Sequence, residues 1–402
     1  MTPPRSSVDR PEPASAGSGP FGVGGAGVGP VRTQHVVVAT AADPLELDCG
    51  RRLGHVEVGY ETYGRLDPDG GNAVYLCHAL TGDAHAAGID GVTGAVGWWD
   101  ALIGPGRAID TDRWFVVCGT LLGSCLGTTG PTTADPATGR PYGLDFPPLT
   151  IADQARVHRR LCRALGIDRL HAVIGPSVGG MHALQWFLDA PEEIGRTVLI
   201  ASSGRLTVEN RAFSAAGRQA ILDDPGFDGG RYLERGGPGP VVGLAAARRF
   251  AHITYVSGGS LQRKLGDAPP SPWPPREAAD WLAPGRAIER YLEHQGRSFL
   301  DRFDALSYLY LTRPMDDFDP FGEQAAAAAR SAVQRNPAAR HRVISFDSDW
   351  RFGADHSRAL VDGLRAAGAL DVSHQELAAP WGHDAFLLEV DGFPELIAES
   401  LR

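Results

Sequence analysis

The stretch that decides the fold is His-Ala-Val-Ile-Gly-Pro-Ser-Val-Gly-Gly-Met-His-Ala-Leu-Gln-Trp, residues 171–186. Its first four residues predict a buried strand and its last six predict a helix, while residues 175–179 between them match the pattern Gly-x-Ser-x-Gly. In this pattern a sharp turn from strand to helix holds the serine in a strained backbone conformation and exposes its hydroxyl at the edge of a sheet. The stretch therefore predicts that Ser177 is a nucleophile. The alternative is a tight turn with an inert serine.

Further strand patterns lie on both sides of this stretch. Several of them are continuous apolar runs, which are typical of buried parallel strands. Helix-like segments lie between them, such as residues 151–165, where Thr150 and Asp153 resemble a capping box. This alternation predicts an α/β fold with a mostly parallel sheet. The strand patterns are His35–Val38, Val56–Tyr60, Val74–Leu76, Trp114–Val117, His171–Ile174, Thr197–Ile200, Val343–Phe346 and Val372–Glu376.

The patterns divide the chain into four segments. Residues 1–33 are dominated by Gly, Pro and Ser and cannot bury enough apolar surface to offset the entropy of ordering, so we expect a disordered tail. Residues 34–205 and 336–402 contain the strand patterns. Residues 206–335 show helical periodicity and almost no strand pattern. We therefore expect one α/β core in two parts, with a helical insertion between them.

The composition excludes several classes of protein. The chain has 402 residues, 43% hydrophobic and 21% charged, as in ordinary globular proteins. A net charge of −10 disfavours a chain-wide nucleic-acid surface, and no apolar run approaches the ~18 residues of a membrane span. Five cysteines without Cys-x-x-Cys spacing argue against a disulfide framework and against a cysteine-rich zinc site. Residues 1–33 contain no apolar core of a secretory signal, so we expect a cytoplasmic protein. We also expect no bound metal.

A serine nucleophile needs a histidine base and an acid that orients the histidine. On a strand–turn–helix of this kind the order along the chain is serine, acid, histidine. His383 lies in a loop after the last predicted strand, from which it can reach Ser177; the alternative is a solvated loop histidine. The strand Val343–Phe346 is followed by Asp347 and Asp349, and position alone fits either of them as the acid.

A series of short motifs runs in order through residues 35–400. The motifs are Cys77–His85, Gly97–Asp100, Gly127–Pro131, Gly179–Met181, Gly217–Ile221, Ala247–Arg248, Thr254–Tyr255, Arg302–Ala305, Ser307–Leu311 and Gly382–Asp384. Together they resemble the homoserine O-acetyltransferase family. The resemblance implies an α/β-hydrolase fold with an inserted helical lid. It also implies an enzyme that moves an acyl group from acyl-CoA to the hydroxyl of an amino acid.

The resemblance assigns roles in the reacting centre. Ser177 matches the nucleophile and His383 the base. The family's acid lies in a Ser-Asp pair after the strand, which selects Asp349. Tetrahedral oxyanions need preorganised donors; one is the N–H after the nucleophile, here that of Val178, and the resemblance puts the other at Leu80.

The resemblance also assigns the acceptor site. Arg248 matches an arginine that binds the substrate carboxylate, Asp384 matches an aspartate that holds the substrate amine, and Tyr255 matches a lid tyrosine near the reacting centre. Arginine suits a carboxylate by bidentate hydrogen bonding, and a carboxylate suits an ammonium group. Arg218 is a rival for the carboxylate on the same grounds, and Asp384 could instead brace the histidine loop.

We therefore expect a cytoplasmic homodimeric enzyme that acetylates L-homoserine by a ping-pong mechanism, with acetyl-CoA as co-substrate and no bound cofactor. Its partners would be these small molecules, with no nucleic acid and no membrane. Alternatives are serine or another hydroxylated metabolite as acceptor, succinyl-CoA as donor, a serine hydrolase on the same scaffold, or a binding module without activity. The chain departs from the family pattern at Pro176, Thr120, Leu306 and Val256.

Overall fold

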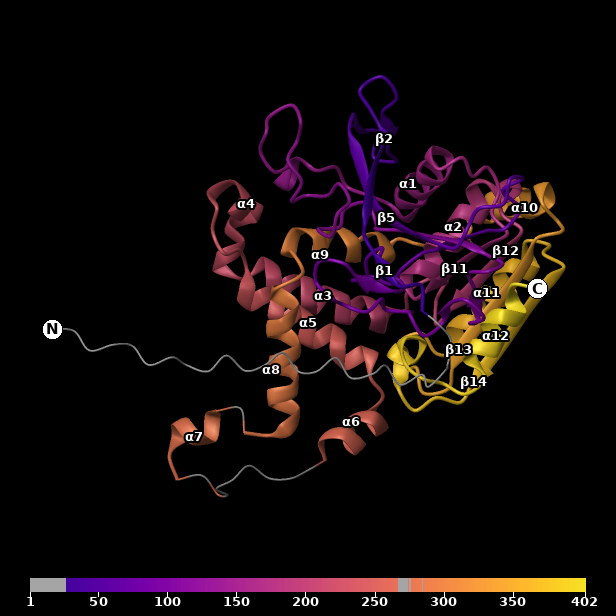
Figure 1. Cartoon of the computed structure of the whole chain (residues 1–402). Helices are drawn as coiled ribbons and strands as arrows, with labels where there is room; N and C mark the ends of the chain where they lie inside the picture. Colours follow the sequence, from indigo (N-terminus) through magenta and orange to yellow (C-terminus); the bar gives the residue numbers. More distant parts are fainter. Residues whose placement is uncertain (1–26, 267–273, 275, 284) are drawn as a thin grey trace.

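An eight-stranded sheet forms the centre of the computed structural model, which describes residues 27–266, 274, 276–283 and 285–402 (Figure 1). All eight strands predicted from the sequence are members of this sheet, so the predicted α/β fold is confirmed. In spatial order the strands are β14 (Asp371–Leu377), β13 (Arg340–Phe346), β12 (Arg196–Ile200), β11 (Ala172–Pro176), β6 (Ala73–Leu76), β10 (Phe115–Gly119), β5 (Val56–Tyr63) and β2 (Gln34–Ala39).

The strands from β14 to β10 are parallel, whereas β5 and β2 at the other edge are antiparallel to their neighbours. The carboxyl ends of β6, β11, β12 and β13 therefore meet at one edge of the sheet. Loops that leave these ends are brought together although they lie far apart in the sequence.

Helices cover both faces of the sheet because both faces are apolar. Val173 belongs to the hydrophobic cluster shared with α1 and α2, while its neighbour Ile174 belongs to the cluster on the opposite face with Phe393 and Ile397 of α12. The helices of the core are α1 (Ile151–Ala164), α2 (Val178–Asp189), α11 (Ala354–Ala366) and α12 (Phe393–Ser400).

The start of α1 confirms the predicted capping box. The N–H of Asp153 donates to Thr150 Oγ1 at 3.1 Å, and the N–H of Thr150 donates to Asp153 Oδ2 at 2.8 Å. Aspartate thus replaces the usual glutamate without loss of the reciprocal bond, which satisfies two N–H groups that a helix start leaves unpaired.

Between β12 and β13 the chain forms helices and no strand within the described residues. Helices α3 and α8 both pack against α5, and Figure 1 shows α6 and α7 farther from the sheet. We keep the lid insertion at residues 206–335, within a core of 34–205 and 336–402, as our proposal for the domain boundaries. The helices are α3 (Val208–Leu222), α4 (Tyr232–Arg235), α5 (Val241–Tyr255), α6 (Gly258–Leu265), α7 (Ala278–Leu282), α8 (Ala287–Leu300), α9 (Ala305–Thr312) and α10 (Ala326–Arg335).

The expected tail needs one correction. Residues 1–26 lie outside the described residues, but Pro30–Val31 form β1 and pair with β7 (Ile89–Asp90), although we expected disorder through residue 33. Two hydrogen bonds, from Ile89 N–H to the Gly29 carbonyl and from Gly91 N–H to the Val31 carbonyl, fix this segment at 3.0 Å each. Composition misses such pairing because the partner strand lies almost sixty residues away.

Other short pairs complete the described fold. Strands β3 (Leu45–Glu46) and β4 (Arg52–Leu53) pair antiparallel, and β8 (Ile103–Gly104) and β9 (Ile109–Asp110) pair parallel. Within the described ranges no helix is both long and apolar enough to cross a bilayer.

Candidate active site

Ser177 occupies the sharp turn between β11 and α2. Its φ of 57° and ψ of −125° are strained for a residue with a side chain. The turn is possible because Gly179 lies against the end of β6, where a Cβ atom would stand 2.0 Å from the Cys77 carbonyl oxygen. The N–H of Ser177 donates to the Ile200 carbonyl at 2.8 Å, so the missing N–H of Pro176 does not interrupt this contact with β12.

Ser177, His383 and Asp349 form a continuous hydrogen-bonded chain. His383 Nε2 lies 2.9 Å from Ser177 Oγ, and His383 Nδ1 lies 2.8 Å from Asp349 Oδ2. Asp349 Oδ1 accepts the N–H groups of Arg351 and Phe352, each at 2.9 Å. Burial alone would raise the pKa of the Asp349 carboxyl, but the His383 charge and these hydrogen bonds together hold the pKa below its usual value.

Asp347, the other carboxylate that fitted by position, binds backbone groups and not His383. Its Oδ1 accepts the N–H of Ala379 at 2.9 Å, and its own N–H donates to the Leu377 carbonyl at 3.0 Å. Asp347 therefore ties the loop after β13 to the loop after β14, the loop that leads to His383. The hydrogen bonds therefore favour Asp349 over Asp347 as the acid that orients His383, a choice that sequence position alone left open.

The loop after β6 brings Leu80 to the cavity in front of Ser177. Val178 is the first residue of α2, so the Val178 N–H has no carbonyl partner within its helix. Buried His78 braces the loop, because its Nδ1 lies 2.7 Å from the Ala79 carbonyl oxygen while its Nε2 lies 3.1 Å from the Leu121 N–H. The loop is thus held before any substrate enters.

A cavity of about 100 Å³ in front of Ser177 brings the core and the lid together. Arg248 and Tyr255 of α5 line it, together with His383 and Asp384. The Arg248 guanidinium lies 5.6 Å from the centre of the Tyr255 ring and 4.8 Å from that of Phe299. These rings hold the cation in place without neutralising it.

The environment of Asp384 suits binding of a cation. Burial raises the pKa of its carboxyl to about 6, and the positive charges of His383 and Arg248 limit that rise. Among the described residues Asp384 makes no ion pair within 4.0 Å. A largely buried carboxylate without a paired cation is costly unless a ligand supplies the charge.

Arg218, the other candidate for binding the substrate carboxylate, forms an ion pair with Asp316. Its Nη2 lies 2.5 Å from Asp316 Oδ2, and both side chains are buried. It does not line the cavity at Ser177. Arg248 is therefore the arginine of this pair that the structure brings to the site.

A second arginine, which we did not predict from the sequence, lines the same cavity. Arg351, two residues after Asp349, is 6% exposed, and its Nη1 donates to Thr254 Oγ1 at 2.7 Å. Its guanidinium also lies 5.6 Å from the centre of the Tyr255 ring, and no carboxylate within the described residues lies within 4.0 Å of it. Proximity in sequence to the acid was the only signal that could have revealed it.

The remaining departures from the family pattern lie around the site and are structurally accommodated. Thr120 is buried, and its Oγ1 accepts the N–H of Ala84 at 3.0 Å, which ties the end of β10 to the loop after β6. Leu306 is buried at the start of α9, and the Val256 carbonyl accepts the indole N–H of Trp350 at 3.4 Å. Within the described ranges no group of three or more His, Cys, Asp or Glu side chains could hold a metal ion.

A serine on this turn, with a histidine and an aspartate from the loops after β14 and β13, defines an enzyme of the α/β-hydrolase fold. The profile of a family described as alpha/beta hydrolase fold matches residues 72–235. A homoserine O-succinyltransferase of Nocardioides sp. is 54% identical over 374 residues, 93% of this chain and 99% of the relative. A homoserine O-acetyltransferase of Rhodopseudomonas palustris is 45% identical over 376 residues, 92% of this chain and 91% of the relative. The chain belongs to the homoserine O-acyltransferase family and is an acyltransferase.

Solved structures agree with the fold. The crystal structure of homoserine O-acetyltransferase from Bacillus anthracis superposes with a TM-score of 0.81 at 28% identity, covering 92% of this chain and 98% of that one. The structure of esterase E22 superposes with a TM-score of 0.80 at 27% identity, covering 92% of this chain and all of that one, 100%. The scaffold thus occurs in proteins named as transferases and in proteins named as esterases.

Proposed function

We propose that this chain transfers an acyl group from acyl-CoA to the hydroxyl of L-homoserine through an acyl-enzyme at Ser177. The observation that supports this most is that one cavity is lined by Ser177 and His383 together with Arg248 and Asp384. A nucleophile and a base suit any acyl transfer. A cation and an anion beside them suit an acceptor with a free carboxylate and a free ammonium group, which is an amino acid.

In the first half-reaction His383 takes the proton of Ser177 Oγ while that oxygen bonds to the thioester carbonyl carbon. The carbon–sulfur bond then breaks, His383 passes the proton to the leaving CoA thiolate, and an acyl ester remains on Ser177. Asp349 keeps the other ring proton on Nδ1 and stabilises the imidazolium. The N–H groups of Leu80 and Val178 are the proposed donors to the oxyanion.

In the second half-reaction His383 takes the proton of the homoserine hydroxyl, whose oxygen attacks the ester carbon. The bond to Ser177 breaks, and the proton returns to Ser177 Oγ. Arg248 binds the homoserine carboxylate and Asp384 its ammonium group, with Tyr255 beside both reacting groups. Because CoA leaves before the acceptor reacts, the kinetics are ping-pong, and acyl-CoA acts as co-substrate with no bound cofactor.

Arg351 bears on the identity of the acyl donor. The homoserine carboxylate accounts for Arg248 and leaves the buried Arg351 guanidinium without an anion, which is costly in a low-dielectric cavity. The free carboxylate of a succinyl group would supply that anion, whereas an acetyl group has none. The 54% identical relative is named a succinyltransferase. We therefore favour succinyl-CoA over acetyl-CoA as the donor. The loop from His78 to His85 and the acetyltransferase relatives support acetyl-CoA as the alternative.

Intact-protein mass spectrometry with each donor tests this assignment. Wild type should gain the mass of a succinyl ester faster than that of an acetyl ester, and Ser177→Ala should gain neither. Loss of a charged contact typically costs ~30- to 1000-fold, so Arg351→Leu should lower kcat/KM for succinyl-CoA by that factor and spare acetyl-CoA. Exposed Arg358 of α11 gives a matched control, because Arg358→Leu should leave both donors unchanged. A wild-type preference for acetyl-CoA would restore the donor expected from the sequence.

Ester hydrolysis is the second candidate, favoured by the likeness to esterase E22. In that case water, rather than homoserine, would release the acyl group from Ser177. Pre-formed acyl-enzyme mixed with buffer or with homoserine distinguishes the two. Our proposal requires that homoserine accelerate release and that the product be O-acylhomoserine, an intermediate consistent with methionine biosynthesis.

We also propose a homodimer through the lid, the assembly that the family resemblance implies. Three apolar side chains on one face of α5 remain exposed: Val242 by 74%, Phe250 by 38% and Ile253 by 37%. Light scattering should give twice the chain mass, and Phe250→Asp should give a monomer. A wild-type monomer at micromolar concentration would contradict this assembly. All five cysteines are thiols, which supports the cytoplasm as the proposed location.

A further inference from the structure

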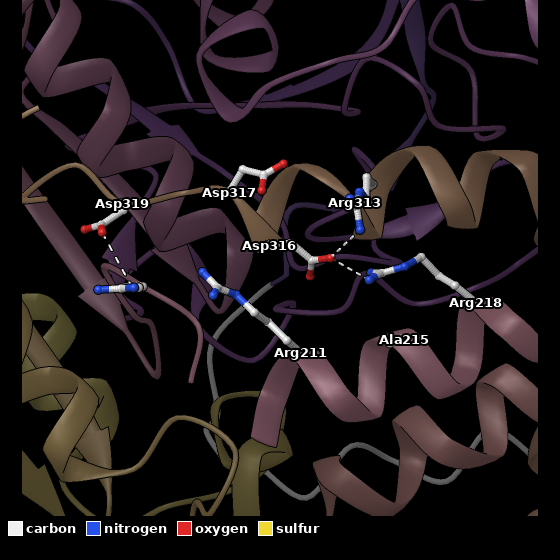
Figure 2. A pocket seen from close by; sticks show the side chains of 8 residues that line it. Arg211, Ala215, Arg218, Arg313, Asp316, Asp317 and Asp319 are labelled. Atoms are coloured by element: carbon white, nitrogen blue, oxygen red, sulfur yellow. Dashed lines mark hydrogen bonds and ion pairs between the residues drawn. The ribbon is translucent and has the colours of Figure 1, made fainter. Parts of the chain in front are cut away.

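A second cavity, of about 530 Å³, lies between α3 and the turn η4 (Pro314–Asp316). We call it the arginine pocket, because Arg205, Arg211, Arg218 and Arg313 line it together with three aspartates. Figure 2 shows that Arg211 and Arg218 extend from α3 toward the segment that bears the aspartates. Nothing in the mechanism above uses this cavity.

The charges in the arginine pocket are unequal. Arg218 and Arg313 share Asp316, at 2.5 and 3.1 Å, and Arg205 lies 3.5 Å from Asp319. Arg211 has no carboxylate within 4.0 Å among the described residues, and its buried Nε lacks a hydrogen-bond partner there. Figure 2 accordingly draws no dashed line to it. Asp317, which also lines the pocket, is exposed and has no cation within 4.0 Å among the described residues. Four arginines and three aspartates still give the pocket a net charge of +1, which favours an anion.

The arginine pocket and the catalytic cavity share a wall. Met315 lines the cavity at Ser177, while the next residue, Asp316, lines the arginine pocket. A hydrogen bond also connects the two cavities. Asn210 Nδ2 donates at 2.9 Å to the carbonyl of Arg351, which lines the catalytic cavity, and the residue after Asn210 is Arg211, which lines the arginine pocket. A ligand that occupies both cavities would pass the Met315 side chain, which is unbranched and adaptable.

We propose that the arginine pocket binds the phosphate groups of the acyl-CoA donor, with Arg211 as the main contact and the pantetheine arm passing Met315 to Ser177. This inference rests on the proposed function. The catalytic cavity of about 100 Å³ is too small for the nucleotide of CoA, so its phosphates must lie outside. Arginine binds phosphate through paired, charge-assisted hydrogen bonds. Arg205, whose ion pair is long and whose side chain is 65% exposed, is available as a second contact.

A donor without phosphates provides the test. We compare acyl-CoA with the same acyl group on pantetheine, using wild type, Arg211→Gln and the double variant Arg205→Gln/Arg211→Gln. Loss of a charged hydrogen bond predicts that Arg211→Gln lowers kcat/KM for acyl-CoA ~10- to 100-fold, mainly through KM. The double variant should lose more. Both variants should have the same kcat/KM as wild type for acyl-pantetheine and for homoserine. Arg235 of α4, whose side chain is 63% exposed and pairs with Asp228, gives the control Arg235→Gln, which should change nothing.

Two results would overturn the inference while leaving the proposed function intact: full use of acyl-CoA by Arg211→Gln, or an equal loss with both donors. A wild-type enzyme that no acyl-CoA acylates would instead overturn the proposed function, and this inference with it. If Arg211→Gln does not fold, wild type alone decides. Adenosine 3′,5′-bisphosphate should then compete with acyl-CoA and not with acyl-pantetheine, and equal inhibition of both, or of neither, would refute phosphate binding in this pocket.

Discussion

Two aspartates that are two positions apart differ in what their carboxylates touch. Asp349 holds His383, whereas Asp347 holds the N–H of Ala379. Asp349→Asn should therefore lower kcat by about 10⁴-fold, because an amide favours the wrong tautomer of His383. Asp347→Asn should cost far less, since Ala379 can still donate to an amide oxygen. Single-turnover acylation of Ser177, with circular dichroism to verify folding, measures both; the reverse ranking would refute the assigned acid.

The carboxyl of Asp384 should make acceptor binding depend on pH. Burial raises its pKa to about 6, so the group is charged above that pH and neutral below it. As the pH falls through about 6, kcat/KM for homoserine should fall with loss of the partner for the ammonium group. The acylation step, which does not use Asp384, serves as the reference for every other effect of pH on the enzyme. Asp384→Asn should have a low kcat/KM for homoserine at every pH. In this variant the acylation step and the transfer step should show the same dependence on pH.

The same raised pKa has a consequence for stability, with a fixed sign. A carboxyl whose pKa rises on folding costs stability where it is charged, so the cost is full above pH ~6 and absent below pH ~4. Asp384→Asn should therefore be more stable than wild type at pH 8, by on the order of 3 kcal/mol, and nearly equal to it at pH 4. Urea unfolding at the two pH values tests this, and a destabilised variant at pH 8 would show that Asp384 braces its loop.

At the scale of helices and strands, apolar patterning was sufficient to predict the central sheet. The central strands β6, β11 and β12 run between covered faces and therefore show apolar runs in the sequence. The turn at Ser177 follows from residues adjacent in the chain. Features that depend on distant partners were not predictable. Strand β1 forms only against β7, and Arg351 reaches the cavity because its N–H binds the carboxylate of Asp349. Periodicity contains no information about either contact.

The link between α3 and η4 depends on one buried ion pair. Arg218 of α3 holds Asp316, which Arg313 also approaches from a more exposed position. Arg218→Met should destabilise the fold by about 3 kcal/mol, because it leaves Asp316 buried with its weaker partner. The double variant Arg218→Met/Asp316→Leu should recover most of that loss. Urea unfolding of the four proteins measures the coupling, and additive effects of the two substitutions would show that the pair is not a structural link.

At the scale of the whole molecule, we propose that the core and the lid each contribute side chains to the reaction. In the proposed mechanism the core supplies Ser177, Asp349 and His383, which form the acyl-enzyme, and Asp384, which binds the acceptor ammonium group. Helix α5 of the proposed lid supplies Arg248 and Tyr255, which line the same cavity as Ser177. In the proposed mechanism Arg248 contacts only the acceptor, so its substitution should affect the second half-reaction alone.

Arg248→Ala tests this division, because the acyl donor needs no contact with Arg248 while the homoserine carboxylate does. The variant should keep a burst of CoA release equal to one acyl group per site, but transfer to homoserine should fall ~30- to 1000-fold. Preference for homoserine over its amide, which lacks the carboxylate charge, should also disappear. The adjacent Arg249, which does not line the cavity, gives the matched control Arg249→Ala with both half-reactions intact. If Arg248→Ala transferred the acyl group at wild-type efficiency, α5 would have no part in binding the acceptor, and the hydrolase alternative would gain.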